Sequence, residues 1–144
     1  MSLTNFLGKK LVSCAPNTSV KQVAKLMKDE DVGCVVVLQD GKLSGIVTDR
    51  DLAVRCLADS FDGNSPVQKV MTKPVLTASV DDGIHDVVEK MKKNEIRRIP
   101  VVDKSGKTIG VLSFGDVFGL LSQEFSDLSQ TASPSSPKLY KKAA

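Results

Sequence analysis

Hydrophobic positions recur in the same order twice along this chain. Each copy holds four apolar positions with the i, i+3, i+4, i+7 spacing of an amphipathic helix: Val20, Val23, Ala24 and Met27 in the first, then Ile84, Val87, Val88 and Met91 in the second. An unbroken apolar run follows each helix, at 35–38 and 99–102. Such runs are typical of strands buried on both faces. The pattern therefore predicts a duplicated structural unit.

The flanking segments complete the unit. Short extended segments precede the helices, turn residues follow the apolar runs, and second strands at 43–47 and 108–112 complete two hairpins before second helices begin. Each copy is predicted to be β-α-β-β-α. A single copy of roughly 55 residues would bury little apolar area alone, so we expect the copies to pack on each other.

The domain boundaries follow from the same alignment. We predict a first repeat at 6–60, a linker at 61–66 and a second repeat at 67–125. Residues 126–144 are rich in Ser, Pro, Lys and Ala, and this composition predicts a disordered tail.

A short motif occurs twice, at 45–51 and 110–116: glycine, two aliphatic residues, a hydroxyl residue, two variable positions and an aspartate. Thr48 with Asp51, and Ser113 with Asp116, fit a capping box, which needs no ligand. The alternative is a binding role, because a helix N-terminus after a strand favours phosphate and a carboxylate can accept hydrogen bonds from a ribose diol. Two copies facing each other would form a cleft at their interface.

Composition excludes several classes of function. The 144 residues are 41% hydrophobic and lack both a signal peptide pattern and an apolar run of about 18 residues, so we expect a cytoplasmic protein without a membrane span. Cys14, Cys34 and Cys56 lie among apolar neighbours without paired spacing, and the only histidine is His85; no metal site is predicted. Of the net charge of +3, residues 126–144 carry three Lys minus one Asp, or +2. Subtracting this +2 from +3 leaves +1 for the folded part, so nucleic-acid binding loses its main support; a binder that uses the basic tail is the weaker alternative.

Two such repeats carrying Gly-h-h-Thr/Ser-x-x-Asp (h, aliphatic) resemble a pair of cystathionine-β-synthase (CBS) domains, also called a Bateman module. The resemblance covers about residues 6–122, and the segment 98–103, Arg-Ile-Pro-Val-Val-Asp, adds a second family signature. It implies an α+β fold in which two β-α-β-β-α repeats pack through their sheets. It also implies a regulatory module that binds an adenosine-containing ligand such as AMP, ADP, ATP, NAD or S-adenosylmethionine.

The resemblance implies two unequal clefts, one for each motif. The preferred cleft would have Asp51 on the ribose, Thr48 at the ribose–phosphate edge, Ile84 and Ile96 on adenine, and arginines near phosphate; its residues would be Thr48, Arg50, Asp51, Ser79, Ile84, Ile96, Arg97 and Arg98. For the two adjacent arginines, a surface salt bridge is the alternative. The weaker cleft has Gly33 and Cys34 where the other has arginines, and its residues would be Ala15, Val20, Val32, Gly33, Ser113 and Asp116. Phe114 could stack on a base there or fill the mouth.

The sequence offers no nucleophile–base pair and no carboxylate pair for acid–base chemistry, so no catalytic residue and no enzymatic activity are predicted. We expect a nucleotide sensor that signals to an effector protein and holds no resident cofactor. The resemblance also implies a homodimer. The alternative is a dimerising interaction scaffold that binds no ligand.

Overall fold

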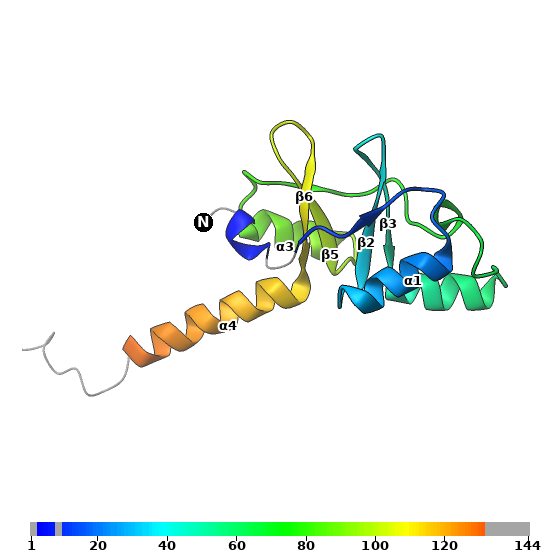
Figure 1. Ribbon diagram of the computed structural model, residues 1–144. Helices are drawn as coiled ribbons and strands as arrows, with labels where there is room; N and C mark the ends of the chain where they lie inside the picture. Colours follow the sequence, from blue (N-terminus) through cyan, green and yellow to red (C-terminus); the bar gives the residue numbers. More distant parts are fainter. Residues whose placement is uncertain (1–2, 8–9, 132–144) are drawn as a thin grey trace, which may run out of the picture.

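The computed structural model describes residues 3–7 and 10–131 and contains two α+β repeats side by side, each built on a three-stranded sheet (Figure 1). The first repeat consists of β1 (Ser13–Cys14), α1 (Val20–Asp29), β2 (Cys34–Gln39), β3 (Lys42–Thr48), α2 (Asp49–Asp51) and the π-helical turn η2 (Leu52–Cys56). The second consists of β4 (Ala78–Ser79), α3 (Ile84–Lys93), β5 (Arg98–Val102), β6 (Thr108–Ser113) and α4 (Phe114–Thr131). The predicted order β-α-β-β-α is confirmed in both.

The two sheets have the same topology. In the orders β1-β2-β3 and β4-β5-β6, the first pair of strands is parallel and the second pair is an antiparallel hairpin. The first hairpin turns at Asp40 and Gly41, whose φ angles of 51° and 76° are those of a tight hairpin turn that favours Asp or Asn followed by Gly. The turn sequence thus fixes the hairpin register.

The central strands are buried on both faces, as their unbroken apolar sequences predicted. Val35 and Val37 pack in the core beneath α1, whereas Val36, also fully buried, lies on the opposite face of the strand. In the second repeat Ile99 and Val101 point into the core, and buried Pro100 lies on the opposite face. The opposite faces are the ones through which the repeats pack on each other.

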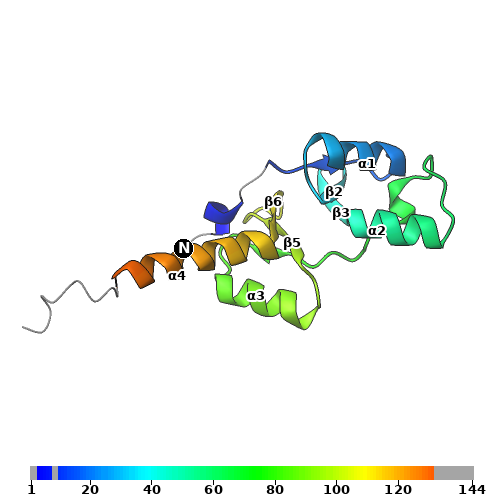
Figure 2. The same ribbon diagram turned by 90° about the horizontal axis from the view of Figure 1, so that it is seen from below.

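The two repeats exchange the segments that precede them. Leu3 and Phe6, from the 3-10 turn η1 (Leu3–Phe6), pack in the core of the second repeat, beside α3 and α4 (Figures 1 and 2). Val67, Val70 and Met71, around the 3-10 turn η3 (Val67–Lys69), pack in the core of the first. The core of each repeat therefore includes residues that lie outside the range predicted for that repeat: Leu3 and Phe6 for the second, and Val67, Val70 and Met71 for the first.

This exchange explains the motif glycines. A Cβ atom on Gly110 would lie 2.9 Å from Leu7, and one on Gly45 would collide with the sulfur of Met71. Leu7 and Met71 occupy equivalent places in the two copies of the repeated pattern, so each glycine accommodates a side chain from the exchanged segment. The backbone of Ile46 also pairs with Thr72, through N–H···O bonds of 3.2 and 2.8 Å.

Helix α4 is longer than predicted. It continues to Thr131 and projects away from the two repeats (Figure 1), so residues 126–131 of the expected tail are helical. The rest of that tail, 132–144, lies outside the described residues. Among the described residues, no helix has the length and apolar character needed to cross a membrane.

Candidate functional site: a cleft between the repeats

A cavity of about 280 Å³ lies between the repeats. The first repeat and the segment before it contribute Lys10, Leu11, Val12, Asp31, Val32, Gly33 and Cys34, and the second contributes Arg98, Val111, Ser113 and Asp116. Four of the six residues predicted for the weaker cleft are therefore brought together. Ala15 and Val20 are not among the lining residues: Ala15 is exposed, and Val20 is buried in the core of the first repeat.

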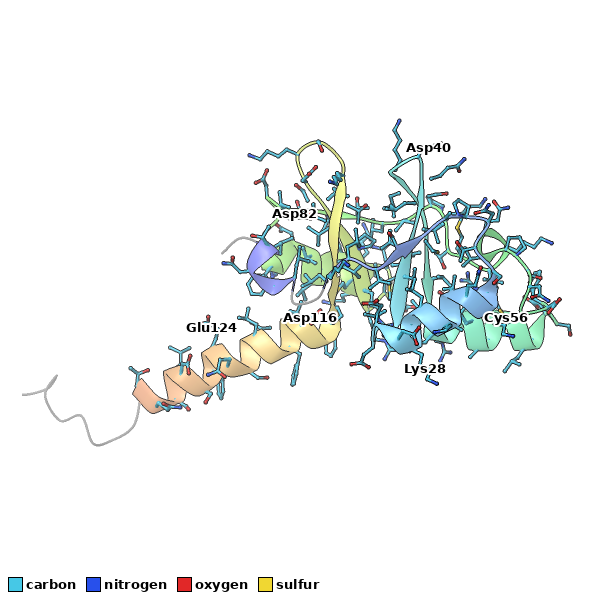
Figure 3. All side chains as sticks on the ribbon, in the orientation of Figure 1. Lys28, Asp40, Cys56, Asp82, Asp116 and Glu124 are labelled. Carbon is cyan, nitrogen blue, oxygen red and sulfur yellow. The ribbon has the colours of Figure 1, made fainter. Side chains whose placement is uncertain are left out.

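Ser113 and Asp116 form a reciprocal capping box where β6 passes into α4, at the place labelled Asp116 in Figure 3. The N–H and hydroxyl of Ser113 donate to Asp116 Oδ2 at 2.8 and 2.6 Å, and the N–H of Asp116 donates to Ser113 Oγ at 3.2 Å. Within the described part of the chain, every hydrogen bond to this carboxylate ends on Oδ2. Oδ1 remains available to a ligand in the cavity that Asp116 lines.

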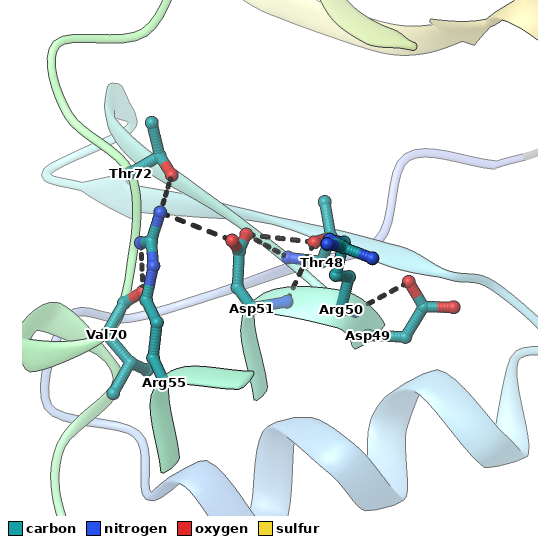
Figure 4. Close-up of polar contacts among 7 residues, drawn as sticks. All are labelled: Thr48, Asp49, Arg50, Asp51, Arg55, Val70 and Thr72. Carbon is teal, nitrogen blue, oxygen red and sulfur yellow. Dashed lines mark hydrogen bonds and ion pairs between the residues drawn. The ribbon is translucent and has the colours of Figure 1, made fainter. Parts of the chain in front are cut away.

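Thr48 and Asp51 form the same box at the start of α2, but the second oxygen of this carboxylate is engaged. Asp51 Oδ2 accepts from the N–H and hydroxyl of Thr48, both at 2.9 Å, while Oδ1 lies 3.3 Å from Nη2 of Arg55 (Figure 4). Arg55 also donates to the Val70 carbonyl at 2.6 Å and to the Thr72 hydroxyl at 2.9 Å. The two motifs are thus alike in their capping and unlike in their available oxygens.

Arg55 was not among the residues predicted from sequence. It follows Asp51 with the i, i+4 spacing of a helical ion pair, and the equivalent position in the second repeat holds Leu120. This one difference between the repeats could have been found by comparing the second helices.

Arg98 does not lie where it was predicted. It was assigned to the cleft of Asp51, but its side chain lines the cavity of Asp116. A Cβ atom on Gly33 would lie 2.5 Å from Arg98 Nη2, so the glycine leaves space for the guanidinium. Nη1 of Arg98 lies 3.6 Å from Oδ1 of Asp49, an ion pair between the two repeats. The cleft expected to carry less positive charge therefore contains an arginine from the second repeat.

The remaining residues predicted for the Asp51 cleft make several different contacts. The N–H of Ser79 donates to Asp82 Oδ2 at 3.0 Å, Ile84 begins α3 and packs against the core of the second repeat, and Arg50 is exposed. Ile96 and Arg97 line a separate apolar groove of about 380 Å³ between α3 and α4, whose lining includes Phe114 and Phe118.

Phe114 belongs to that groove and not to the cavity of Asp116. Its ring stacks on the ring of Phe118, with 5.9 Å between centroids. The aromatic ring is therefore part of an apolar surface along α4.

Cys34, at the wall of the Asp116 cavity, is a poor nucleophile. Burial raises the pKa of its thiol to about 12, against an opposing effect of the nearby Arg98 guanidinium.

His85 is exposed on the first turn of α3. Across residues 3–7 and 10–131, no group of three His, Cys, Asp or Glu side chains is arranged to hold a metal ion.

Comparison with known proteins agrees with this architecture. The family model described as the CBS domain matches residues 4–57 and 67–123. The chain belongs to the CBS domain family. CBS domain-containing protein YhcV of Bacillus subtilis (strain 168) is 32% identical over 116 residues, which are 81% of this chain and 82% of that protein. Homoserine O-acetyltransferase of Methanococcus vannielii is 33% identical over 110 residues, 76% of this chain but 22% of that enzyme.

Solved structures of CBS domain pairs share the fold. The CBS pair of protein MJ0100, in complex with 5′-methylthioadenosine and S-adenosyl-L-methionine, has a TM-score of 0.77 and 28% identity over 84% of this chain and 99% of that one. CBS domain protein PAE2072 from Pyrobaculum aerophilum, complexed with AMP, has a TM-score of 0.75 and 26% identity over 85% of this chain and 99% of that one.

Proposed function

We propose that this CBS pair is a non-catalytic regulatory module that binds an adenosine-containing ligand in the cavity between its repeats and signals occupancy to an effector protein. The observation that carries the proposal is Oδ1 of Asp116, which accepts no hydrogen bond from the described residues and belongs to a side chain that lines a cavity between the repeats. The adenosine ligands of MJ0100 and PAE2072 support it.

The cavity has the chemistry that a nucleoside requires. Asp116 can accept hydrogen bonds from the ribose hydroxyls, as an acidic residue does in dinucleotide-binding folds. Val12, Val32 and Val111 provide apolar wall for a purine. At about 280 Å³ the cavity lies near the lower end of the range for small-molecule sites, which is about 300–1,000 Å³.

We rank the Asp116 cleft above the Asp51 cleft, which reverses the order expected from sequence. That order rested on Arg97 and Arg98 as phosphate contacts of the Asp51 cleft. Arg98, however, lines the Asp116 cavity, and Arg55 pairs with Oδ1 of Asp51. A ligand at Asp51 would first have to displace Arg55. We retain the Asp51 cleft as a weaker second site.

Matched substitutions test this ranking. Asp116→Asn and Asp51→Asn alter equivalent capping boxes, and Asp51→Asn also weakens the ion pair with Arg55, so binding is compared at a temperature where both variants are folded. Titration calorimetry with 5′-methylthioadenosine, S-adenosylmethionine, AMP, ATP and NAD should detect at least one ligand. For that ligand, Asp116→Asn should weaken binding by about tenfold or more, since a hydrogen bond to a charged group contributes about 1.5–3 kcal/mol.

Thermal unfolding gives an independent readout. A ligand at 100 times its dissociation constant should stabilise the wild-type protein by about 2.7 kcal/mol. The proposed function would be rejected if none of the five ligands bound. A larger effect of Asp51→Asn than of Asp116→Asn would reject the ranking of the clefts.

A second candidate function, a dimerising scaffold, is favoured by an apolar stripe along α4 that begins at the groove between α3 and α4. Five large apolar side chains on this helix are 51–75% exposed and follow one another at intervals of four, three, four and three residues: Phe114, Phe118, Leu121, Phe125 and Leu128. This is the heptad spacing of a helix–helix seam. Pairing with a second copy would bury on the order of 500 Å² per chain, given about 150–250 Å² for a buried aromatic side chain. The total would reach the lower end of specific interfaces.

Sedimentation equilibrium tests the dimer. Phe125→Ser, in the middle of the seam, should shift the protein from dimer to monomer, whereas Val54→Ser, at an exposed apolar residue of the first repeat, should not. A wild-type protein that stays monomeric at high micromolar concentration would contradict this candidate. A dimer that binds none of the five ligands would favour the scaffold over the sensor.

A further inference from the structure

We infer that Asp49 determines which adenosine-containing ligands the cavity accepts, favouring a neutral or positively charged 5′ substituent over a phosphate. The inference rests on the proposed function, because it concerns the ligand of the same cavity. Asp49 lies outside the Ser113–Asp116 motif, and its carboxylate selects ligands by the charge of their 5′ substituent.

Two hydrogen bonds hold Asp49, the acidic member of the ion pair with Arg98. The N–H of Asp49 donates to the Gly33 carbonyl at 3.2 Å, and its Oδ1 accepts from the N–H of Arg50 at 2.9 Å. A Cβ atom on Gly33 would lie 3.0 Å from Asp49 Oδ2 and 2.5 Å from Arg98 Nη2. Both charged groups therefore converge on one glycine at the cavity wall.

The carboxylate of Asp49 lies beside a cationic group of the cavity. Arg98 lines the cavity, and its Nη1 lies 3.6 Å from Oδ1 of Asp49. A phosphate group would bring close to two further negative charges into this environment.

Arg98 is the cationic group best placed to receive a phosphate. Its side chain is 31% exposed, whereas Lys10 belongs to an exposed residue. Arginine binds phosphate through paired N–H donors, but here one terminal nitrogen faces Asp49. A phosphate must compete with the Asp49 carboxylate for Arg98. 5′-Methylthioadenosine faces no such competition, because its thioether substituent carries no anionic group.

Removal of the Asp49 charge should therefore change the ratio of the affinities for AMP and 5′-methylthioadenosine and should not weaken the binding of both ligands. In Asp49→Asn the carboxylate is replaced by an amide of the same shape, and Arg98 becomes available. We expect the affinity for AMP to rise by about fivefold or more, while the affinity for 5′-methylthioadenosine stays within about twofold; a fivefold ratio corresponds to about 1 kcal/mol.

The experiment is titration calorimetry of wild type, Asp49→Asn and a control with AMP and 5′-methylthioadenosine at fixed ionic strength. The control is Asp40→Asn, which removes the same charge from the exposed tip of the β2–β3 hairpin (Figure 3). Wild type should bind 5′-methylthioadenosine more tightly than AMP, and only Asp49→Asn should narrow that difference. Binding of both ligands with an unchanged ratio in Asp49→Asn, or the same change in Asp40→Asn, overturns the role of Asp49 and leaves the proposed function intact. If neither ligand binds any of the three proteins, the role of Asp49 is overturned, and the proposed function falls with it only if S-adenosylmethionine, ATP and NAD also fail to bind.

Discussion

Replacing Arg55 by leucine would make the first repeat resemble the second at the residue that pairs with Asp51. In the wild-type protein the guanidinium bonds to Asp51 in its own helix and to Val70 and Thr72 in the segment that enters the core of the first repeat (Figure 4). Leucine is the residue at the equivalent position, 120. The substitution should lower stability and, at the same time, free the Oδ1 atom of Asp51.

The loss of stability can be estimated bond by bond. The hydrogen bond from the charged guanidinium to the Val70 carbonyl, 2.6 Å long and partly buried, is of a kind worth about 1.5–3 kcal/mol. The ion pair with Asp51 joins side chains that are 38% and 18% exposed, and such a pair contributes about 0–1 kcal/mol. The bond to the Thr72 hydroxyl is exposed and adds little. Since these terms share one side chain and are not additive, we expect a loss of about 2–3 kcal/mol.

Urea unfolding measures this loss, with Arg50→Leu as the control. Arg50 is an exposed arginine in α2, directly before the turn that carries Arg55, and its removal should change stability by no more than about 0.5 kcal/mol. Equal destabilisation by the two variants would refute the assignment of these bonds to Arg55. The same preparation tests the second cleft: if a nucleoside binds wild type once, Arg55→Leu should show a second site, and unchanged stoichiometry would argue against Arg55 as the group that blocks Asp51.

Two further predictions concern the cores. Leu3→Ala should destabilise the protein by about 2.7–5 kcal/mol in urea unfolding, because Leu3 is fully buried in the core of the second repeat; a loss below about 1 kcal/mol would contradict that packing. Native Cys34 should resist iodoacetamide at pH 8, since a pKa raised from 9.0 to about 12 leaves about a thousandfold less thiolate. Above pH 9 its burial should cost stability, because the unfolded thiol ionises first and the folded one only near pH 12. Alkylation of Cys34 as fast as of the unfolded chain would contradict both statements.

The repeated fold could be predicted from sequence because its signals are local. Helical spacing, apolar runs and turn residues each fixed one element, and the duplication confirmed each assignment. The exchange of Leu3 and Val67 could not be predicted, because a buried aliphatic residue gives no indication of which core receives it. The length of α4 was underestimated because Ser126, Ser129 and Thr131 suggested a tail, although Phe125 and Leu128 continue the apolar face of the helix.

The site was predicted in part. The motif located both capping boxes, but the side to which Arg98 turns depends on the space left by Gly33, which is a property of the folded interface. A comparison restricted to the motif also could not find the pairing of Asp51 with Arg55, which lies one helical turn beyond it. Equal motifs therefore gave unequal sites.

The exchanged segments affect both cleavage of the connector and unfolding of the chain. A cut in the connector, at Asp62 or Gly63, would give two fragments, and each fragment would carry part of the other's core: Leu3 and Phe6 on one, Val67 and Val70 on the other. Fragment complementation should therefore succeed where separate expression of either repeat fails. The pair should also melt in one cooperative transition, since neither repeat can unfold without withdrawing a segment from its neighbour.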